Sequence, residues 1–271
     1  MPSPSSAPLL FDFRHLDVYR GERRVLHAFD LQVRRGEHIA LFGPNGCGKS
    51  TLIKTLTREL YPVAHPRLRF QVLGRDDWDV NDLHRLLGIV ALDSLHQLSH
   101  EVVVRTVTAR ELVLSGFFGS LGLWPHQRVT PAQQQRAQAL LRFLDIAHLA
   151  NRPVSAMSAG EQRRALIGRA LVHDPAALIL DEPTNSLDPG AVREFRLLLR
   201  KLIRAGKTLV LVTHHVSDLI PEIERVILMK AGRVITDGPP ARIVTSRTLS
   251  RLFGTRLNVV HRAGRFSLVA G

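Results

Sequence analysis

The sequence predicts an α/β domain built on a mainly parallel sheet, because short apolar strands alternate with helices along much of the chain. An apolar segment at 38–42 leads directly into a glycine-rich loop and then into a helix over 50–59. Further along, strand-like runs at 176–180 and 208–213 flank an amphipathic helix at 191–204. Since parallel strands need such crossover helices between them, we expect these elements to share one core.

Two regions differ from this alternation. Residues 11–19 and 25–33 alternate apolar and polar side chains around a Gly21-Glu22 turn, which predicts an antiparallel pair of strands. Between residues 76 and 157 strand-like runs are few, and the pattern indicates a helical insert. Its helices are expected at 84–87, 108–114 and 131–144, and a further hairpin is expected at 226–229 and 233–236.

The composition is that of a globular protein with an unusual charge. The chain has 271 residues, of which 45% are apolar and 23% charged, and this usage excludes a mostly disordered or fibrous chain. The net charge of +13 indicates nucleic acid, an anionic membrane surface or an acidic partner as a binding target. Arg greatly outnumbers Lys, which also fits a genome that favours Arg codons. The single cysteine, Cys47, excludes a disulfide framework.

Neither a membrane span nor a signal peptide is predicted. The uncharged run 112–127 is broken by glycines and a proline and is shorter than the roughly 20 apolar residues that a spanning helix needs. The N-terminus has no basic stretch followed by an apolar one, so it is not typical of a secretory signal. We therefore expect a cytoplasmic protein with a disordered leader at 1–10.

The loop from Gly43 to Ser50 matches the phosphate-binding pattern G-x-x-x-x-G-K-[ST] in its proper strand–loop–helix context. Glycines let backbone N–H groups turn toward an anion, and the following helix adds its positive N-terminal end. Lys49 reaches the β- and γ-phosphates in such loops, and the Ser50 hydroxyl ligates Mg²⁺. The alternative to a phosphate-binding loop is a simple turn between a strand and a helix.

Two later strands end in residues suited to phosphate chemistry. The apolar run before Asp181 and Glu182 predicts a strand whose end lies at the ligand crevice, with Asp181 near the metal and Glu182 near an attacking water. The strand before His214 and His215 ends in the same way, so one histidine is a candidate partner for the γ-phosphate. The alternative is a pair of solvated or locally satisfied histidines.

With these motifs, the sequence resembles the ATP-binding cassette (ABC) ATPases. The segment 157–164, Met-Ser-Ala-Gly-Glu-Gln-Arg-Arg, is similar to the family's Leu-Ser-Gly-Gly-Gln signature and its helix. The segment 181–188, Asp-Glu-Pro-Thr-Asn-Ser-Leu-Asp, matches the extended Walker B and D-loop motifs. His214 fits the switch histidine and Tyr19 the aromatic residue that stacks on adenine. The similarity covers about residues 11–253.

The resemblance implies the ABC ATPase fold, in which a P-loop NTPase core with a mainly parallel sheet carries an antiparallel β subdomain and a helical insert. A single domain would span 11–253 and be followed by a short extension at 254–271. Within it, 11–75 and 163–240 would form the nucleotide-binding core and 76–162 the helical subdomain.

The resemblance also implies a mechanism. Two such domains, either two copies of this chain or this chain and a related ABC ATPase, pair head to tail and enclose Mg²⁺ and ATP. Glu182 and His214 would be catalytic, and Ser50 and Asp181 would ligate the metal, while Asp188 would signal across the dimer. The residues expected to bind ATP are Tyr19, Gly43, Pro44, Asn45, Gly46, Cys47, Gly48, Lys49, Ser50, Thr51, Ser158 and Gly160, the last two acting on the ATP of the other subunit.

The sequence departs from the family pattern at three places. Ala159 replaces the first signature glycine, and Glu161 replaces the usual glutamine. The glutamine expected after residues 88–90, which normally contacts Mg²⁺ and the membrane subunit, is missing. Leu92 occupies its place, and Gln97 is the nearest downstream candidate.

The implied function is the energy-coupling ATPase of a transporter with separate permease subunits, placed at the inner face of the cell membrane through them. Phe117, Phe118 and Trp124 are candidates for the docking patch, or alternatively for helix core. The insert and signature are similar to molybdate or metal-chelate uptake subunits. The alternative is a soluble ABC ATPase acting on nucleic acid or the ribosome, which the single cassette and the lack of heptads disfavour. The signature disfavours a kinase or GTPase.

Overall fold

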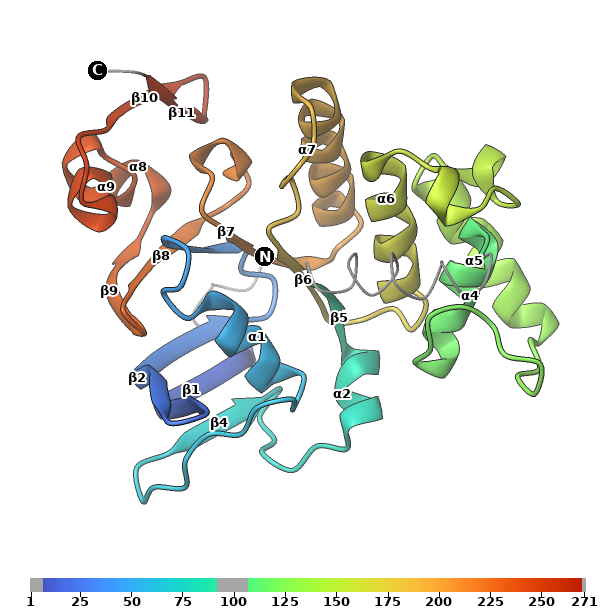
Figure 1. The fold of residues 1–271 in the computed structure, drawn as a ribbon, viewed down its shortest axis with the longest axis horizontal. Helices are drawn as coiled ribbons and strands as arrows, with labels where there is room; N and C mark the ends of the chain where they lie inside the picture. The colour runs from blue at the N-terminus through green and yellow to red at the C-terminus, as the bar shows by residue number, and fades with distance from the viewer. Residues whose placement is uncertain (1–6, 92–106, 270–271) are drawn as a thin grey trace. The chain divides into compact units, whose positions relative to one another are not determined.

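The computed structural model describes residues 7–91 and 107–269, and its contacts divide the chain into two compact units. The first unit combines Met1–Val80 with Ile203–Gly271, and the second comprises Asn81–Leu202 (Figure 1). The second unit ends later than the helical subdomain expected at 76–162. It also contains the acidic strand and the helix after it, because that strand pairs with a strand that opens the same unit. Each unit is described by itself.

The first unit contains an antiparallel sheet with the strand order β2-β1-β4. Strands β1 (Leu9–Arg20) and β2 (Arg23–Arg34) form the expected pair, in which Phe11 lies opposite Val33. Strand β1 begins at Leu9, inside the leader expected at 1–10, because Leu10 is fully buried in the sheet. Strand β4 (Arg69–Val72) was not predicted, although Phe70 and Val72 alternate with polar residues and pack inward.

The first unit also contains a second, mainly parallel sheet with the order β7-β3-β8-β9. Strand β3 (Ile39–Phe42) is fully buried and runs parallel to both β7 (Thr208–Thr213) and β8 (Arg225–Lys230). Strand β9 (Arg233–Gly238) closes the edge as the antiparallel partner of β8, which confirms the expected hairpin. Helix α1 (Lys49–Leu56) follows β3 and packs against β2 (Figure 1).

Short elements complete the first unit. Near the end of β7 lies the single turn η4 (Val216–Asp218), and α8 (Pro240–Ile243) and α9 (Ser246–Phe253) follow β9. The expected C-terminal extension is an ordered hairpin of β10 (Asn258–Arg262) and β11 (Arg265–Val269). Strand β11 packs against η4, and the Phe266 side chain is buried.

The second unit is built around a parallel strand pair and a cluster of helices. Strand β5 (Leu87–Val90) pairs with β6 (Ala177–Asp181), all of whose residues are buried. The expected helix at 84–87 is wrong at its end, because Leu87 belongs to β5 and the helix α2 covers Val80–Leu86. The remaining helices are α4 (Ala109–Ser115), η1 (Gly116–Phe118), α5 (Pro131–Phe143), η2 (Ala147–Leu149), η3 (Val154–Ala156), α6 (Ala159–Ala170) and α7 (Pro189–Arg204).

Helix α6 is the centre of this cluster and contacts α4, α5 and β5 (Figure 1). Two glycines permit the close approach. A Cβ on Gly116 would lie 2.3 Å from the Arg169 carbonyl oxygen, and one on Gly168 would lie 2.9 Å from Val113 Cγ2. The amphipathic helix α7 buries Phe195, Leu198, Leu199 and Leu202. Across residues 7–91 and 107–269, no helix is long and apolar enough to cross a membrane.

Candidate nucleotide-binding site

The glycine-rich loop joins β3 to α1 and has the shape of an anion cradle. Gly46 and Gly48 have φ angles of 75° and 112°, in the left-handed region that favours glycine. Gly48 occupies the N-cap of α1, and a Cβ there would lie 2.8 Å from Leu26 Cδ2. A Cβ on Gly43 would lie 2.4 Å from the Met229 carbonyl oxygen. The loop therefore packs closely against neighbouring atoms and ends at a helix N-terminus. The partial positive charge of that N-terminus favours the binding of an anion.

Lys49, the first residue of α1, is 5% exposed, and its ammonium group points back over the loop. The Nζ atom donates hydrogen bonds to the carbonyl oxygens of Gly43 at 2.7 Å and Pro44 at 3.2 Å. The positive charge is thus held inside the loop in which phosphates are expected. Asn45, Gly46 and Ser50 are exposed, whereas Cys47 and Thr51 are buried.

The turn after β7 carries His214 and lies next to the loop. Strands β3 and β7 are paired so that Phe42 lies opposite Thr213, and the Gly43 N–H donates to the Thr213 carbonyl at 3.4 Å. The Thr213 hydroxyl accepts from the His215 N–H at 3.0 Å and donates to the Asp218 carboxylate at 2.6 Å. The first unit therefore brings His214 to the start of the phosphate loop.

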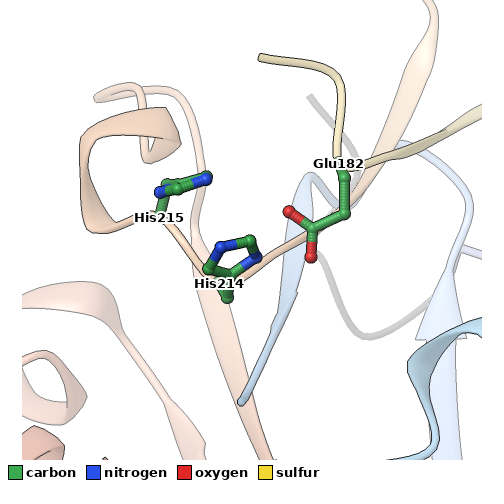
Figure 2. A group of neighbouring side chains, drawn as sticks. All are labelled: Glu182, His214 and His215. Carbon is green, nitrogen blue, oxygen red and sulfur yellow. The ribbon is translucent and has the colours of Figure 1, made fainter. Parts of the chain in front are cut away.

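Figure 2 shows His214 and His215 side by side on this turn, with ring centroids 3.9 Å apart, and Glu182 on its own segment. Tyr19 belongs to the same unit as the histidines. It is 43% exposed near the end of β1, opposite Arg24 of β2. Its ring is accessible for stacking on a base.

The second unit holds the acidic pair. Asp181 ends β6, and both it and Glu182 are buried, with exposures of 7% and 8%. Glu182 has a φ angle of 47°, which is unusual for a residue with a side chain. The buried Arg163 of α6 donates to its carbonyl oxygen at 3.2 Å. The sequence did not single out Arg163, although a basic residue on the inner face of a helix is a recognisable signal.

The signature segment forms the exposed N-terminus of α6. Ser158 is the N-cap, and it forms a capping box with Glu161: the Ser158 N–H donates to Glu161 Oε2 at 2.7 Å, and the Glu161 N–H donates to Ser158 Oγ at 3.4 Å. The hydrogen bond from the Ser158 N–H is the main cause that lowers the pKa of Glu161. Glu161 therefore closes the cap. Around Gly160 there is room, since an added Cβ would meet only Ala191 Cβ at 3.8 Å.

The expected site residues are thus divided between the units. The first contains Tyr19, the phosphate loop and His214, and the second contains Ser158, Gly160, Asp181 and Glu182. Leu92 and Gln97 lie outside the described residues. Asp188, expected to signal to a partner, accepts a hydrogen bond from the Ala191 N–H at the start of α7.

Residues 26–185 match the ABC transporter family model. The hemin import ATP-binding protein HmuV of Streptomyces coelicolor is 33% identical over 261 residues, which cover 96% of this chain and 89% of that protein. The phosphonates import ATP-binding protein PhnC of Anaeromyxobacter dehalogenans is 34% identical over 239 residues. This match covers 87% of this chain but 46% of that relative, so the chain spans about half of its length.

Solved structures give the same result for the fold. CbiO1 from Clostridium perfringens, part of the ABC transporter complex CbiONQ, matches with a TM-score of 0.74 and 27% identity over 90% of this chain and 94% of the other. A dimeric bacterial ABC transporter cassette matches with a TM-score of 0.65 and 25% identity over 84% and 98%. The expected P-loop core with antiparallel and helical subdomains is confirmed, and the chain belongs to the ABC transporter family as one of its ATP-hydrolysing cassettes.

Proposed function

We propose that this chain powers a transporter as one half of a head-to-tail cassette dimer that binds Mg²⁺ and ATP at its interface and docks onto separate permease subunits. The observation that carries this proposal is the buried Lys49, whose ammonium group lies across the carbonyls of the phosphate loop. The dimeric relative supports the pairing. The relatives described above that are named import proteins favour uptake over export.

The residues present fit the nucleotide. The loop N–H groups, the α1 N-terminus and Lys49 would neutralise the β- and γ-phosphates, and Tyr19 would stack on the adenine. His214 would hydrogen-bond the γ-phosphate, and Glu182 would orient the attacking water or accept its proton. Ser158 and Gly160 of the second cassette would cap the γ-phosphate, since the α6 N-terminus is exposed.

A metal ion fits the same donor set. The Ser50 hydroxyl and the Asp181 carboxylate are oxygen ligands of the kind that Mg²⁺ prefers. Bound Mg²⁺ would supply charge neutralisation of the phosphates during phosphoryl transfer.

The permease contact is proposed in the loop that follows η1. Of the three candidates only Trp124 has an exposed side chain, at 51%, whereas Phe117 and Phe118 are partly buried. Phe117 is held by the chain itself, because its ring packs edge-on against His173 with centroids 5.3 Å apart. We therefore assign the permease contact to Trp124 rather than to Phe117.

The test is the variant Glu182→Gln, with Glu22→Gln as a control because Glu22 is exposed in the turn between β1 and β2. We expect E182Q to bind ATP, to lose at least about 100-fold in turnover and to form an ATP-dependent dimer in light scattering. E22Q should behave like the wild type. Turnover by E182Q close to that of the wild type would remove Glu182 from this role.

Membrane coupling is tested by purification in detergent. A multi-span permease should co-purify with the wild type and be lost from Trp124→Ala, while both proteins hydrolyse ATP. ATPase activity stimulated by DNA or ribosomes, with no membrane partner recovered, would overturn the transporter assignment.

A further inference from the structure

Arg163 joins the signature helix to the segment that carries the catalytic glutamate. It lies on α6, five residues after Ser158, and is 4% exposed. Its guanidinium donates to the Glu182 carbonyl at 3.2 Å and makes a second hydrogen bond to the Asn185 carbonyl. One planar group thus ties α6 to two points of the segment after β6.

The segment that Arg163 holds has an unusual backbone. Glu182 and Ser186 adopt φ angles of 47° and 63°. Such a backbone conformation is strained for a residue with a side chain and persists only where its surroundings impose it. The Glu182 carbonyl also accepts from the Asn185 N–H at 3.2 Å, which closes a turn. Because the backbone sets the direction in which the Glu182 side chain leaves the chain, a contact that holds this carbonyl also aims the carboxylate.

The surroundings indicate that this arginine has a specific use. It lines a small cavity together with mostly apolar residues and Asp181; the apolar lining comprises Val90, Ala91, Ile167, Leu180, Pro183 and Phe195. Burial of a guanidinium among apolar side chains is costly unless its donors are used. An arginine presents a rigid fork that reaches two carbonyls at once, whereas lysine is a single point charge.

We propose that Arg163 is a positioning residue that couples the two ATP sites of the dimer. This inference rests on the proposed function. In a head-to-tail pair, Ser158 at the start of α6 contacts the ATP held by the partner, and Glu182 acts on the ATP held by its own subunit. Arg163 links these two positions within one chain, so closure over one ATP is transmitted to the glutamate that serves the other.

The decisive variant is Arg163→Met, which keeps the volume of the side chain and removes every donor. In R163M the Glu182 carbonyl keeps the Asn185 N–H as a donor, whereas the Asn185 carbonyl loses the guanidinium, so some loss of stability is expected and is measured separately by urea unfolding. We expect R163M to bind ATP like the wild type, to lose on the order of 100-fold in kcat through misplacement of Glu182, and to lose cooperativity in ATP, with a Hill coefficient near 1.

The matched control is Arg164→Met. Arg164 is the next residue on α6 and also donates to a main-chain carbonyl, that of Leu144, at 3.0 Å. This hydrogen bond and the 3.6 Å ion pair of Arg164 with Asp145 both involve residues outside the Glu182 segment, so R164M should keep the wild-type kcat and Hill coefficient. An effect on stability alone would be common to both variants, whereas the change in cooperativity should be confined to R163M.

The outcomes separate this inference from the proposed function. If the wild type does not hydrolyse ATP and the E182Q variant does not form an ATP-dependent dimer, the proposed function itself is contradicted. A cooperative wild type with an R163M variant of unchanged kcat and Hill coefficient overturns only the role of Arg163. Should R163M fail to fold, Arg163→Lys decides: reduced kcat and cooperativity in the folded variant support the role, and wild-type values for both overturn it.

Discussion

The Thr213 hydroxyl donates a 2.6 Å hydrogen bond to the Asp218 carboxylate, and both side chains are fully buried. The same hydroxyl accepts from the His215 N–H, and the Thr213 carbonyl accepts from the Gly43 N–H. One residue thus fixes the turn that carries His214 relative to the start of the phosphate loop.

Thr213→Val removes the hydroxyl but keeps the β-branched shape that suits a strand. We expect the free energy of unfolding to fall by about 1–3 kcal/mol, because a buried carboxylate loses a donor. We also expect kcat to fall more than ATP affinity, since the turn holding His214 is released. Urea unfolding and steady-state ATPase assays measure the two effects. Thr213→Ser should preserve both values. A T213V enzyme with normal kcat would show that the hydrogen bonds of the Thr213 hydroxyl do not contribute to catalysis.

Gly232 supports the phosphate loop from the β8–β9 turn. Its N–H donates to the Cys47 carbonyl at 2.9 Å, and a Cβ there would lie 1.9 Å from the Val25 carbonyl oxygen. Gly206 has a similar φ, 81° against 73°, but open space around it. We expect Gly206→Ala to cost about 1–2 kcal/mol in backbone strain alone. Gly232→Ala should cost more and also weaken ATP binding, as measured by thermal unfolding and titration calorimetry. Equal effects of the two variants would contradict this role.

Tyr19 is expected to carry adenine stacking. Stacking of a base on an aromatic ring is worth about 1–3 kcal/mol, so Tyr19→Ala should raise the Kd for ATP about 5- to 150-fold. Tyr19→Phe should retain affinity. The other tyrosine, Tyr61, is 67% exposed in the same unit, and Tyr61→Ala serves as the control. An ATP affinity in Y19A equal to that of Y61A would exclude stacking on Tyr19.

His38 makes the first unit sensitive to acid. Its Nδ1 accepts a hydrogen bond from the Leu209 N–H at 3.2 Å. Burial lowers the pKa of His38 from 6.5, against the opposing effect of Glu224 and Glu222. A lowered folded-state pKa means that the unfolded chain binds the proton more readily, so this contribution to stability is complete above pH 6.5 and is lost as the pH falls below it.

His38→Asn keeps an acceptor near the Nδ1 position and does not titrate. We therefore expect the wild type to lose more stability than H38N between pH 7.5 and 5.5, as measured by the midpoint of urea unfolding. Parallel pH profiles for the two proteins would show that His38 is not the group responsible.

Most elements follow from local patterns, and the errors have physical causes. The phosphate loop, the acidic strand and both expected hairpins are recognisable because periodicity and glycine placement are properties of neighbouring residues. Strand β4 was missed because its alternation extends over only four residues, and the C-terminal hairpin was missed because its mostly exposed strands carry little periodic signal. The start of β5 at Leu87 was also missed, because its pairing with β6 joins residues about ninety positions apart in the chain.

The chemistry of the site was readable from residue types and spacing: a lysine after a glycine-rich loop, two carboxylates after an apolar strand and a serine at a helix start. Three features depend on folding. These are the hydrogen bonds of Arg163 to the Glu182 segment, the buried Thr213–Asp218 hydrogen bond and the close packing of Gly232 against the Val25 carbonyl. Motifs record which groups can meet a phosphate. Arg163 and Gly232 meet main-chain carbonyls of segments distant in the sequence, which carry no residue-specific signature and become neighbours only when the core packs. The Thr213–Asp218 bond depends on the burial of both side chains in the turn after β7.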